Sequence, residues 1–377
     1  MKTIGVGIIG WGFMGKTHAQ ALRSLPLFYP GAAFEPALRC VCAGHLENAR
    51  EAARSLGIDG FTDDYRRLLA REDVDVVSVC TPNELHEEMV VAALAAGKHV
   101  YVDKPLAVTA ESARRIAAAA EGAPGYTRMV FNNRYFPATL RARELVDEGR
   151  IGRVLTFSAR YLHSGSIDPA KPVGWKQGPE GGALLDMGSH ALDLLTWLVG
   201  YPRRVFCKSF TLYPERPLPG GGVTRALSED HVQLLLELEG GAVGTVEASK
   251  IATGSNDELL LEIRGDRGAL MWNAMDPNYL DFFDNTRPEA AYGGLRGFTR
   301  IEAVGRYPAP GGRFLPPKSS VGWERGHLHC YYTFLDAVAR GERPTENTVA
   351  DGARLQALME DCRRAEALGR WVERAGE

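Results

Sequence analysis

Hydrophobic and polar positions form two alternating patterns over the first third of the chain. Short continuous apolar runs predict buried strands, and apolar residues spaced three or four apart predict helices between them. The predicted strands are Ile4–Ile9, Leu38–Cys42, Val76–Cys80, His99–Val102 and Thr127–Phe131; the predicted helices are Met14–Leu25, Glu47–Leu56, Asp64–Ala70, Glu84–Ala96 and Ala110–Ala120. This alternation favours a doubly wound parallel sheet with helices on both faces. We expect a long loop at Pro26–Pro36.

The alternation of strand-like and helix-like segments ends after Asn132. Several strand-like segments with glycine-bearing turns follow one another between Val205 and Phe283, which predicts a mostly antiparallel sheet. The other predicted elements are helix Ala138–Glu148, strand Val154–Leu162, a helix from about Gly182 to Leu198, and helices Leu328–Arg340 and Ala350–Leu368. We therefore predict an α/β protein with a first domain at residues 1–131 and an α+β second domain at residues 132–377.

A glycine-rich turn directly follows the first predicted strand and opens a helix. In Gly10-Trp11-Gly12-Phe13-Met14-Gly15, the first glycine permits a tight turn and the second lets the backbone approach a pyrophosphate. The third allows close helix–strand packing, and the helix N-terminus supplies amide donors. A glycine turn without a ligand is the alternative. In the first unit of an alternating domain, the pattern favours a Rossmann dinucleotide site, with Phe13 and Met14 beside the cofactor.

The end of the second strand bears on the choice of cofactor. Sites for NAD usually carry an acidic residue there to bind the ribose 2′-hydroxyl. This chain has the small residues Ala43 and Gly44, followed by His45. Without that carboxylate a 2′-phosphate is not repelled, and His45 or Arg50 could pair with it, which favours NADP. Glu47 could instead reach the ribose, so NAD stays open.

Polar residues also follow the third and fourth strands, at the edge where parallel sheets bind ligands. Thr81 and Asn83 end the third strand and His86 lies one turn later, although the first two could simply cap a helix. Asp103 and Lys104 end the fourth strand. An ammonium group there can stabilise an oxygen that becomes alkoxide-like, whereas a solvated surface lysine is the ordinary alternative.

Three ionisable residues share the long predicted helix of the second domain. Asp186, His190 and Asp193 fall at i, i+4 and i+7, so an α-helix would place them on one face among leucines. Such a stripe suits a histidine that acts as a general base beside a carboxylate. A structural His–Asp pair is the alternative. A metal site that also uses His327 or His329 is not favoured, because no metal-specific spacing is present.

Composition narrows the functional classes. The 377 residues carry 44 Lys and Arg against 47 Asp and Glu, a net charge of −3, so we expect neither nucleic acid nor a membrane surface as partner. No apolar run reaches the roughly 20 residues of a membrane span, and no signal-peptide pattern opens the sequence. Six scattered cysteines without a C-x-x-C pair favour a reducing, cytoplasmic setting.

Together these features resemble the Gfo/Idh/MocA oxidoreductases, the group of glucose–fructose oxidoreductase and the inositol dehydrogenases. The resemblance covers nearly the whole chain: the Gly10–Gly15 loop, Asp103-Lys104-Pro105, the Gly181–Asp193 segment and the closing helices. It implies that His190 exchanges the substrate's hydroxyl proton, that Asp186 supports it, and that Lys104 steadies the reacting oxygen.

The resemblance also implies further contacts. Asp193 and Arg134 would bind substrate, and Asn132, Trp175 and Lys176 would border the nicotinamide. The second domain would be an open-faced sheet used for a homodimer or homotetramer. Two residues depart from the family pattern: Asp103 replaces a glutamate near the ribose, and Lys176 stands where arginine is frequent.

We therefore expect an NAD(P)-dependent enzyme that transfers a hydride to or from a secondary hydroxyl or keto carbon of a sugar or cyclitol. The segments Pro26–Pro36 and Ser164–Trp175 are similar to those of members that act on pyranoses. A glycosidase that oxidises its substrate transiently is one alternative. A non-catalytic NAD(P)/sugar sensor is another, although such a protein should lack the Lys104, Asp186 and His190 set.

Overall fold

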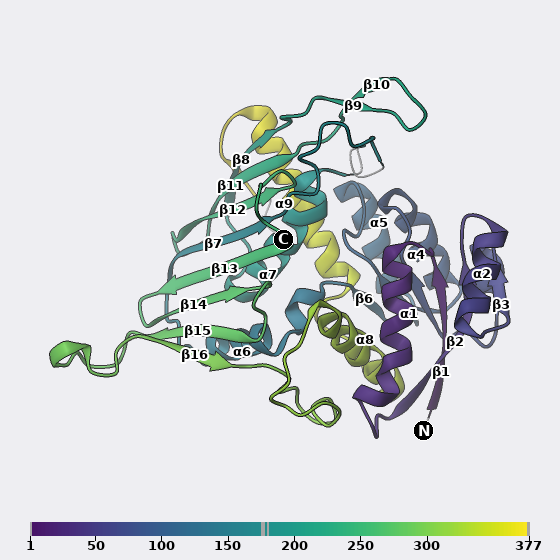
Figure 1. Ribbon diagram of the computed structural model, residues 1–377, viewed down its shortest axis with the longest axis horizontal. Coiled ribbons are helices and arrows are strands. Elements are labelled where there is room, and N and C mark those ends of the chain that lie inside the picture. The colour runs from purple at the N-terminus through teal and green to yellow at the C-terminus, as the bar shows by residue number, and fades with distance from the viewer. Residues whose placement is uncertain (1, 175–177, 179–180, 375–377) are drawn as a thin grey trace. The chain divides into compact units, whose positions relative to one another are not determined.

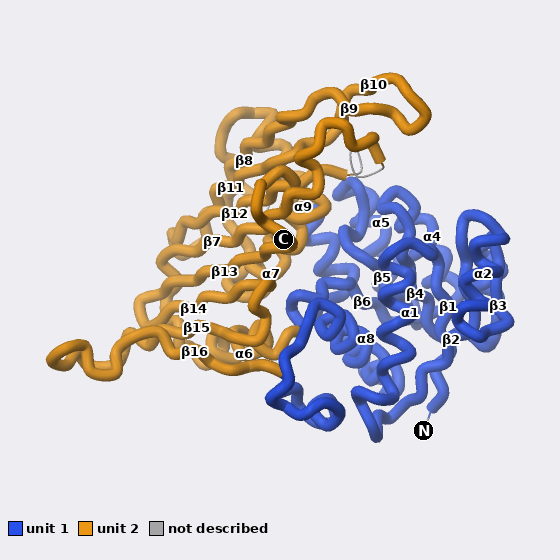
Figure 2. The backbone as a smooth tube through the Cα atoms, viewed as in Figure 1, with its two compact units in different colours: residues 1–135, 305–356 blue, residues 136–304, 357–377 orange. Residues whose placement is uncertain are grey.

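The computed structural model describes residues 2–174, 178 and 181–374. Contacts group the chain into two units, drawn in separate colours in Figure 2: unit 1 is residues 1–135 with 305–356, and unit 2 is residues 136–304 with 357–377. This grouping differs from a division at residue 131, because the chain returns to unit 1 after residue 304. Helix α9 (Val349–Leu368) begins in unit 1 and ends in unit 2.

Unit 1 contains the parallel sheet that the sequence predicts. Within its described residues six strands lie in the order β3-β2-β1-β4-β5-β6, all parallel. Their bounds are β1 Lys2–Ile9, β2 Phe34–Cys42, β3 Gly60–Thr62, β4 Val76–Val79, β5 His99–Val102 and β6 Thr127–Met129. The strand order reverses between β1 and β4, so right-handed crossovers put the helices that follow these two strands on opposite faces. This confirms a doubly wound fold.

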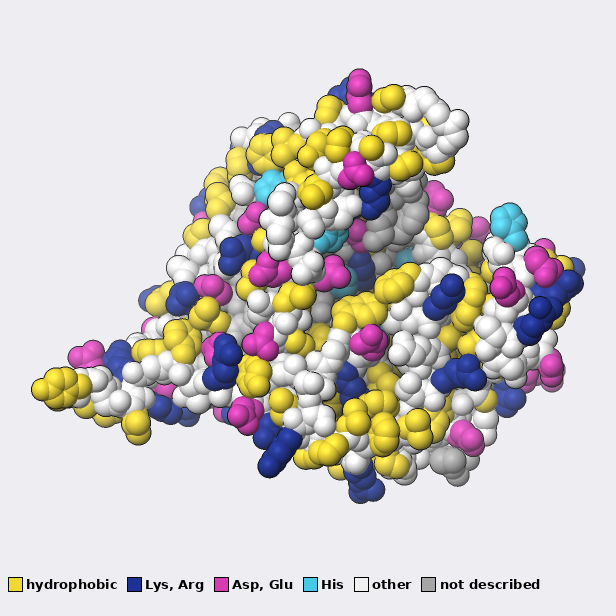
Figure 3. Space-filling view, in the orientation of Figure 1, with side chains coloured by type: hydrophobic (Ala, Val, Ile, Leu, Met, Phe, Trp, Pro, Cys, Tyr) yellow, Lys and Arg dark blue, Asp and Glu magenta, His cyan; other side chains and the backbone are white. Residues whose placement is uncertain are grey.

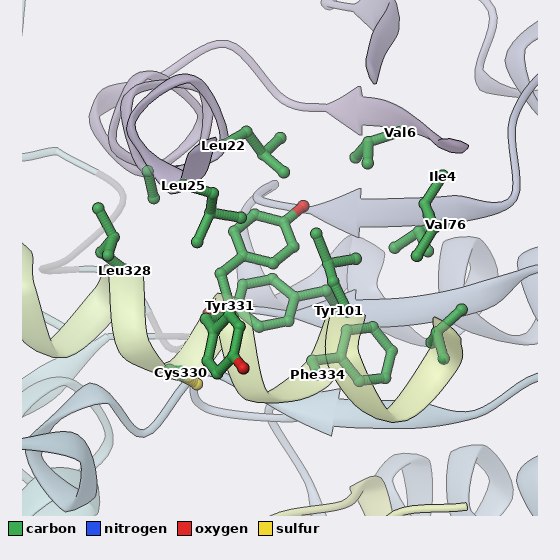
Figure 4. Packing of buried hydrophobic residues seen from close by; sticks show 14 of the residues in the cluster. Ile4, Val6, Leu22, Leu25, Val76, Tyr101, Leu328, Cys330, Tyr331 and Phe334 are labelled. Atoms are coloured by element: carbon green, nitrogen blue, oxygen red, sulfur yellow. The ribbon is translucent and has the colours of Figure 1, made fainter. Parts of the chain in front are cut away.

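The helices of unit 1 cover that sheet (Figure 1). They are α1 Phe13–Phe28, α2 Leu46–Leu56, α3 Tyr65–Leu69, α4 His86–Ala95, α5 Ala110–Glu121 and α8 Trp323–Arg340, with short turns η1 Asn83–Leu85 and η2 Asn132–Tyr135. Helix α8 packs against α1 and the sheet, although some 190 residues of sequence separate it from β6. Figure 4 shows the contact: the rings of Tyr101 on β5 and Tyr331 on α8 stack with centroids 4.0 Å apart.

The predicted loop at Pro26–Pro36 is wrong at both ends. Helix α1 continues through Pro26 to Phe28, and β2 already begins at Phe34. Proline disfavours a helix interior, but here it stands only two residues before the end. Leu25 and Tyr29 are buried in the core of unit 1, so tertiary packing holds the last turn in place. The short strand β3 was not predicted.

Unit 2 contains the mostly antiparallel sheet, which confirms the predicted second fold. Its order in the described residues is β16-β15-β14-β13-β7-β12-β11-β8-β17, and only β12 and β7 of these pair in parallel. The bounds are β7 Val154–Leu162, β8 Arg204–Phe210, β11 His231–Glu237, β12 Val243–Ser249, β13 Glu258–Gly265, β14 Gly268–Asn273, β15 Tyr279–Asp284, β16 Phe298–Glu302 and β17 Val372–Glu373. A separate hairpin pairs β9 Glu215–Pro217 with β10 Val223–Arg225.

Side chains along the central strands of unit 2 alternate between buried and exposed, so the sheet buries only one face. The helical elements on this sheet are α6 Pro137–Asp147, the π-helical turn η4 Leu184–Gly188 and α7 Ser189–Val199. A further turn, η5 Ala291–Gly293, lies between β15 and β16. Among the described residues, no helix is both long and apolar enough to cross a membrane.

Candidate active site

The glycine-rich turn has the geometry expected of a dinucleotide loop. Gly10 has a φ of +101° at the end of β1, and a Cβ there would lie 2.6 Å from the carbonyl oxygen of Cys80. A Cβ on Gly15 would lie 2.0 Å from the carbonyl oxygen of Gly10, so only glycine allows α1 to pack this closely. A Cβ on Gly12 would meet no described atom within 4 Å. The loop is therefore tight at its two ends and open at its centre, which fits a pyrophosphate at the N-terminus of α1.

The residues after β2 are small or exposed. Ala43 is buried, with its N–H donated to the carbonyl of Thr62, whereas Gly44 and His45 are exposed. Arg50 and Glu47, the two alternative candidates for contact with the ribose, form an ion pair: Arg50 Nη1 lies 3.0 Å from Glu47 Oε2. Both side chains are exposed, so this pair contributes at most about 1 kcal/mol and either member can turn toward a ligand.

His86 lies beneath two strand-end loops and has no exposed surface. Its Nε2 is 3.0 Å from the carbonyl oxygen of Thr81, and its Nδ1 is 3.1 Å from that of Pro105. Burial lowers the pKa of His86, which keeps the ring neutral near pH 7. The structure thus places His86 where it ties the loop after β4 to the loop after β5. Asn83 is buried nearby in η1.

Lys104 follows β5 directly and is partly exposed. The Asp103 carboxylate accepts the Lys104 N–H at 2.9 Å, and the Asp103 N–H is donated to the carbonyl of Val79 on β4, so the turn is held to the neighbouring strand. The positive charge of Lys104 reaches His327 on α8, where it adds to the effect of burial in lowering the pKa of that histidine. The strand-end lysine is thus presented from a fixed backbone.

Two residues predicted to bind the cofactor each have a buried polar side-chain atom without a hydrogen-bond partner among the described residues. These atoms are Thr81 Oγ1 and Asn132 Nδ2. Buried polar atoms are normally satisfied, so such atoms beside a ligand loop suggest contacts that form on binding. Together with the open centre of the glycine loop, they fit a nicotinamide dinucleotide. Arg134, predicted to bind substrate, is buried in η2.

The Gly181–Asp193 segment is not a continuous α-helix. Residues Leu184–Gly188 form a π-helical turn, and α7 starts only at Ser189. The wider turn changes the phase between Asp186 and the residues after it, so the expected single face at i, i+4 and i+7 is interrupted. Asp186 and His190 keep partial exposure, whereas Asp193 is 2% exposed. Isolated π-turns occur frequently at functional sites.

Sequence reasoning missed two neighbours of this segment. Lys250, directly after β12, lies with its Nζ 3.4 Å from Asp186 Oδ2. Tyr161 on β7 meets the His190 ring edge-on, with centroids 5.6 Å apart. The pKa of Tyr161 is raised by burial and by the negative charges of Asp257 and Asp186. Lys250 is another lysine at a strand end, so the reasoning that singled out Lys104 could have found it.

Two remaining predictions concern other parts of the chain. Trp175 and Lys176 lie outside the described residues. Among those that are described, no three His, Cys, Asp or Glu side chains are grouped so as to hold a metal ion. His329, one of the metal candidates, instead has its Nδ1 2.8 Å from the Tyr29 hydroxyl.

Comparison with known proteins gives matches over most of the chain. Residues 4–129 match an oxidoreductase family with an NAD-binding Rossmann fold, and residues 139–271 match the Gfo/Idh/MocA C-terminal domain. Levoglucosan dehydrogenase of Pseudarthrobacter phenanthrenivorans is 32% identical over 99% of this chain and 98% of its own length. A myo-inositol 2-dehydrogenase of Thermotoga maritima is 27% identical over 70% of this chain and 74% of its own. A solved levoglucosan dehydrogenase with NADH and L-sorbose superimposes with a TM-score of 0.94, 32% identity and full coverage of both chains.

Proposed function

The chain belongs to the Gfo/Idh/MocA oxidoreductase family, and from this we propose that it is an NAD(P)-dependent dehydrogenase of a sugar, sugar derivative or cyclitol. Hydride transfer would take place at a secondary carbinol carbon. The observation that carries the proposal is the glycine loop, closed at Gly10 and Gly15 and open at Gly12, in a chain that also has a strand-end lysine and a largely buried carboxylate paired with Lys250.

Each proposed catalytic residue has a defined task. The glycine loop would hold a nicotinamide dinucleotide, which would supply the hydride chemistry. His190 takes the hydroxyl proton during oxidation and returns it during reduction. Asp186 supports the imidazolium that forms, and the Lys104 ammonium stabilises negative charge on the reacting oxygen. Arg134 and Asp193 are proposed substrate contacts.

The proposed cofactor contacts belong mainly to the carboxyl edge of the parallel sheet. Backbone donors come from the glycine loop, and polar side chains come from the loops after β4, β5 and β6. The set comprises Gly10, Gly12, Phe13, Met14, Gly15, Ala43, Gly44, His45, Thr81, Asn83, Asp103, Lys104, Asn132, Trp175 and Lys176, with His86 supporting two loops from below. Because no acidic residue ends β2, we propose that the site takes NADP as well as NAD.

Steady-state assays test the proposal directly. We would follow reduced-cofactor absorbance with levoglucosan, other pyranoses, glycosides and inositols, each with NAD and NADP. His190→Gln and Lys104→Met should each lower kcat/KM by about 10² to 10⁴-fold, the range for a general base or an oxyanion stabiliser. Matched controls are His99→Gln, at the opposite end of β5 from Lys104, and Lys318→Met on an exposed loop.

The outcomes separate the alternatives. Normal hydride transfer in both His190→Gln and Lys104→Met would refute the assigned roles. Release of an aglycone without net change in reduced cofactor would identify the transient-oxidation glycosidase instead. Tight binding of NAD(P) and sugar with no turnover on any substrate would identify a sensor.

We further propose that the protein is a homodimer or homotetramer formed through unit 2. The open face of its sheet exposes the apolar side chains of Leu155, Leu235 and Val243. The segment between β15 and β16 projects from the same sheet, with hydrophobic side chains at its end (Figure 3); Tyr292 and Leu295 there are almost fully exposed. Exposed apolar surface of this kind suits association, and light scattering on the eluted protein would give the mass.

A further inference from the structure

Lys250 directly follows strand β12, and two backbone hydrogen bonds hold it in place. Its N–H is donated to the carbonyl of Asp230 at 2.8 Å, and its carbonyl accepts the N–H of Ser166 at 2.9 Å. The side chain is only 4% exposed and ends 3.4 Å from the Asp186 carboxylate, which is itself 13% exposed. The ion pair is therefore largely removed from solvent and its geometry is fixed.

Burying an ammonium group costs several kcal/mol unless an opposite charge and hydrogen bonds compensate. Packing does not require a lysine at this position, because a methionine of similar length would fill the same space. The charge therefore calls for a separate explanation. Its partner is the carboxylate that the proposed function places in support of the general base, and this gives the ammonium a role in the reaction.

We propose that Lys250 is a positioning residue that fixes the Asp186 carboxylate in its ionised form and thereby sets the pH at which His190 can accept a proton. This rests on the proposed function. In this proposal the Lys250 ammonium, 3.4 Å from Asp186, compensates the charge that an imidazolium at His190 would otherwise share. Without Lys250, the full negative charge of Asp186 would act on His190 and favour the protonated ring.

The other charges near Asp186 complete the electrostatic setting. On the elements packed against η4 the titratable and charged groups are His190 and Asp193 of α7, Arg160 and Tyr161 of β7, His231 and Glu237 of β11, and Glu247 of β12, with Glu229 just before β11. The carboxylate of Glu229 accepts the N–H of Leu184 at 2.7 Å and is thus directed to the start of η4. Lys250 supplies a permanent cation within 4 Å of the Asp186 carboxylate.

The test is the titration of His190 by NMR with ring-labelled histidine, its signal assigned by its loss in His190→Gln. In Lys250→Met the midpoint should move to higher pH by about one unit, because the Asp186 charge would no longer be compensated by the ammonium and would favour the protonated ring. Lys250→Arg should keep the midpoint of the unaltered protein. Lys208→Met is the matched control, since Lys208 pairs at the surface of the same sheet with Glu366, 3.8 Å away.

The acidic limb of the kcat/KM profile for alcohol oxidation should move in the same direction and by the same amount. An unchanged His190 midpoint in Lys250→Met overturns the inference, as does a shift in Lys250→Arg equal to that in Lys250→Met. If Lys250→Met does not fold, Lys250→Gln serves in its place with the same expected shift. A protein that transfers no hydride refutes the proposed function, whereas the NMR midpoint still decides whether Lys250 controls the pair.

Discussion

The two units bury their titratable groups in different ways. Unit 1 encloses His18, His86, His327 and His329, and burial lowers the pKa of each, to about 3 for His18 and His329. Unit 2 encloses charged pairs instead. Arg216 and Asp230, both buried, lie 3.6 Å apart, and Lys250 lies 3.4 Å from Asp186.

This difference matches the two tasks of the proposed enzyme. In unit 1 the neutral ring of His86 ties two strand-end loops together without adding a charge to them. A proton-exchanging histidine needs charges at fixed distances, and buried pairs provide them because little water screens them. Each unit can therefore be perturbed in a way that should leave the other unaffected.

The largest effect is expected from breaking a buried pair in unit 2. Arg216→Met leaves the Asp230 carboxylate buried without its cation and also removes donors to the carbonyls of Ser166 and Asp168. The free energy of unfolding should fall by about 3–5 kcal/mol, as measured by urea denaturation. The control is Arg300→Met, whose pair with Asp281 is exposed and should contribute less than about 1 kcal/mol. Equal losses in the two variants would show that burial does not distinguish the pairs.

The next effect concerns the backbone of unit 1. In Gly15→Ala the new Cβ would lie 2.0 Å from the Gly10 carbonyl oxygen, so α1 must shift, at a cost of about 1–3 kcal/mol in stability. Gly12→Ala meets no described atom within 4 Å and should retain its stability while binding NADH more weakly, because the methyl group enters the open centre of the loop. Calorimetric melting and NADH fluorescence titration measure the two properties. Loss of stability in Gly12→Ala, or its retention in Gly15→Ala, would contradict the geometry.

The fold and half of the site could be predicted because their signals are local. The glycines at 10, 12 and 15 predict a turn because of their own conformational freedom, and the continuous apolar runs predict a parallel sheet. The same local rules failed at Pro26. There the packing of Leu25 and Tyr29 in the core of unit 1 outweighs the preference of proline against a helix.

The other half of the site depends on contacts between distant segments. Lys250 meets Asp186 only because the end of β12 lies beside η4, and Tyr161 meets His190 only because α7 packs against β7. Neither pairing has a sequence signal of its own. The π-helical turn was also unpredictable, since periodicity alone cannot distinguish one inserted residue from a regular α-helix.

Acid should act on unit 1 through its neutral histidines. The unfolded chain binds a proton at each histidine near pH 6.5, whereas folded His329 does so only near pH 3, so stability is lost as the pH falls below about 6.5. At pH 5 the loss should be about 1–2 kcal/mol for each of His18 and His329, whose pKa values are lowered to about 3. His329→Gln should reduce the pH dependence of urea unfolding between pH 7.5 and 5 by this amount. An unchanged pH dependence in His329→Gln would mean that the ring takes up its proton over the same pH range in the folded protein as in the unfolded chain.

The smallest effect concerns an exposed ion pair in unit 1, which should contribute much less to stability than the buried pairs of unit 2. Arg50 and Glu47 lie 3.0 Å apart on the surface of α2, so Arg50→Ala should change stability by less than about 1 kcal/mol. If Arg50 binds a 2′-phosphate, the variant should lower kcat/KM for NADP by about two- to fivefold, a surface-charge effect of about 0.5–1 kcal/mol, and leave the value for NAD unchanged. Arg54→Ala on the same helix is the control.

Glu47→Ala should have the opposite effect, because it frees Arg50 and removes a negative charge. Equal changes for both cofactors would show that neither residue reaches the ribose, and the choice of cofactor would then depend on Ala43, Gly44 and His45.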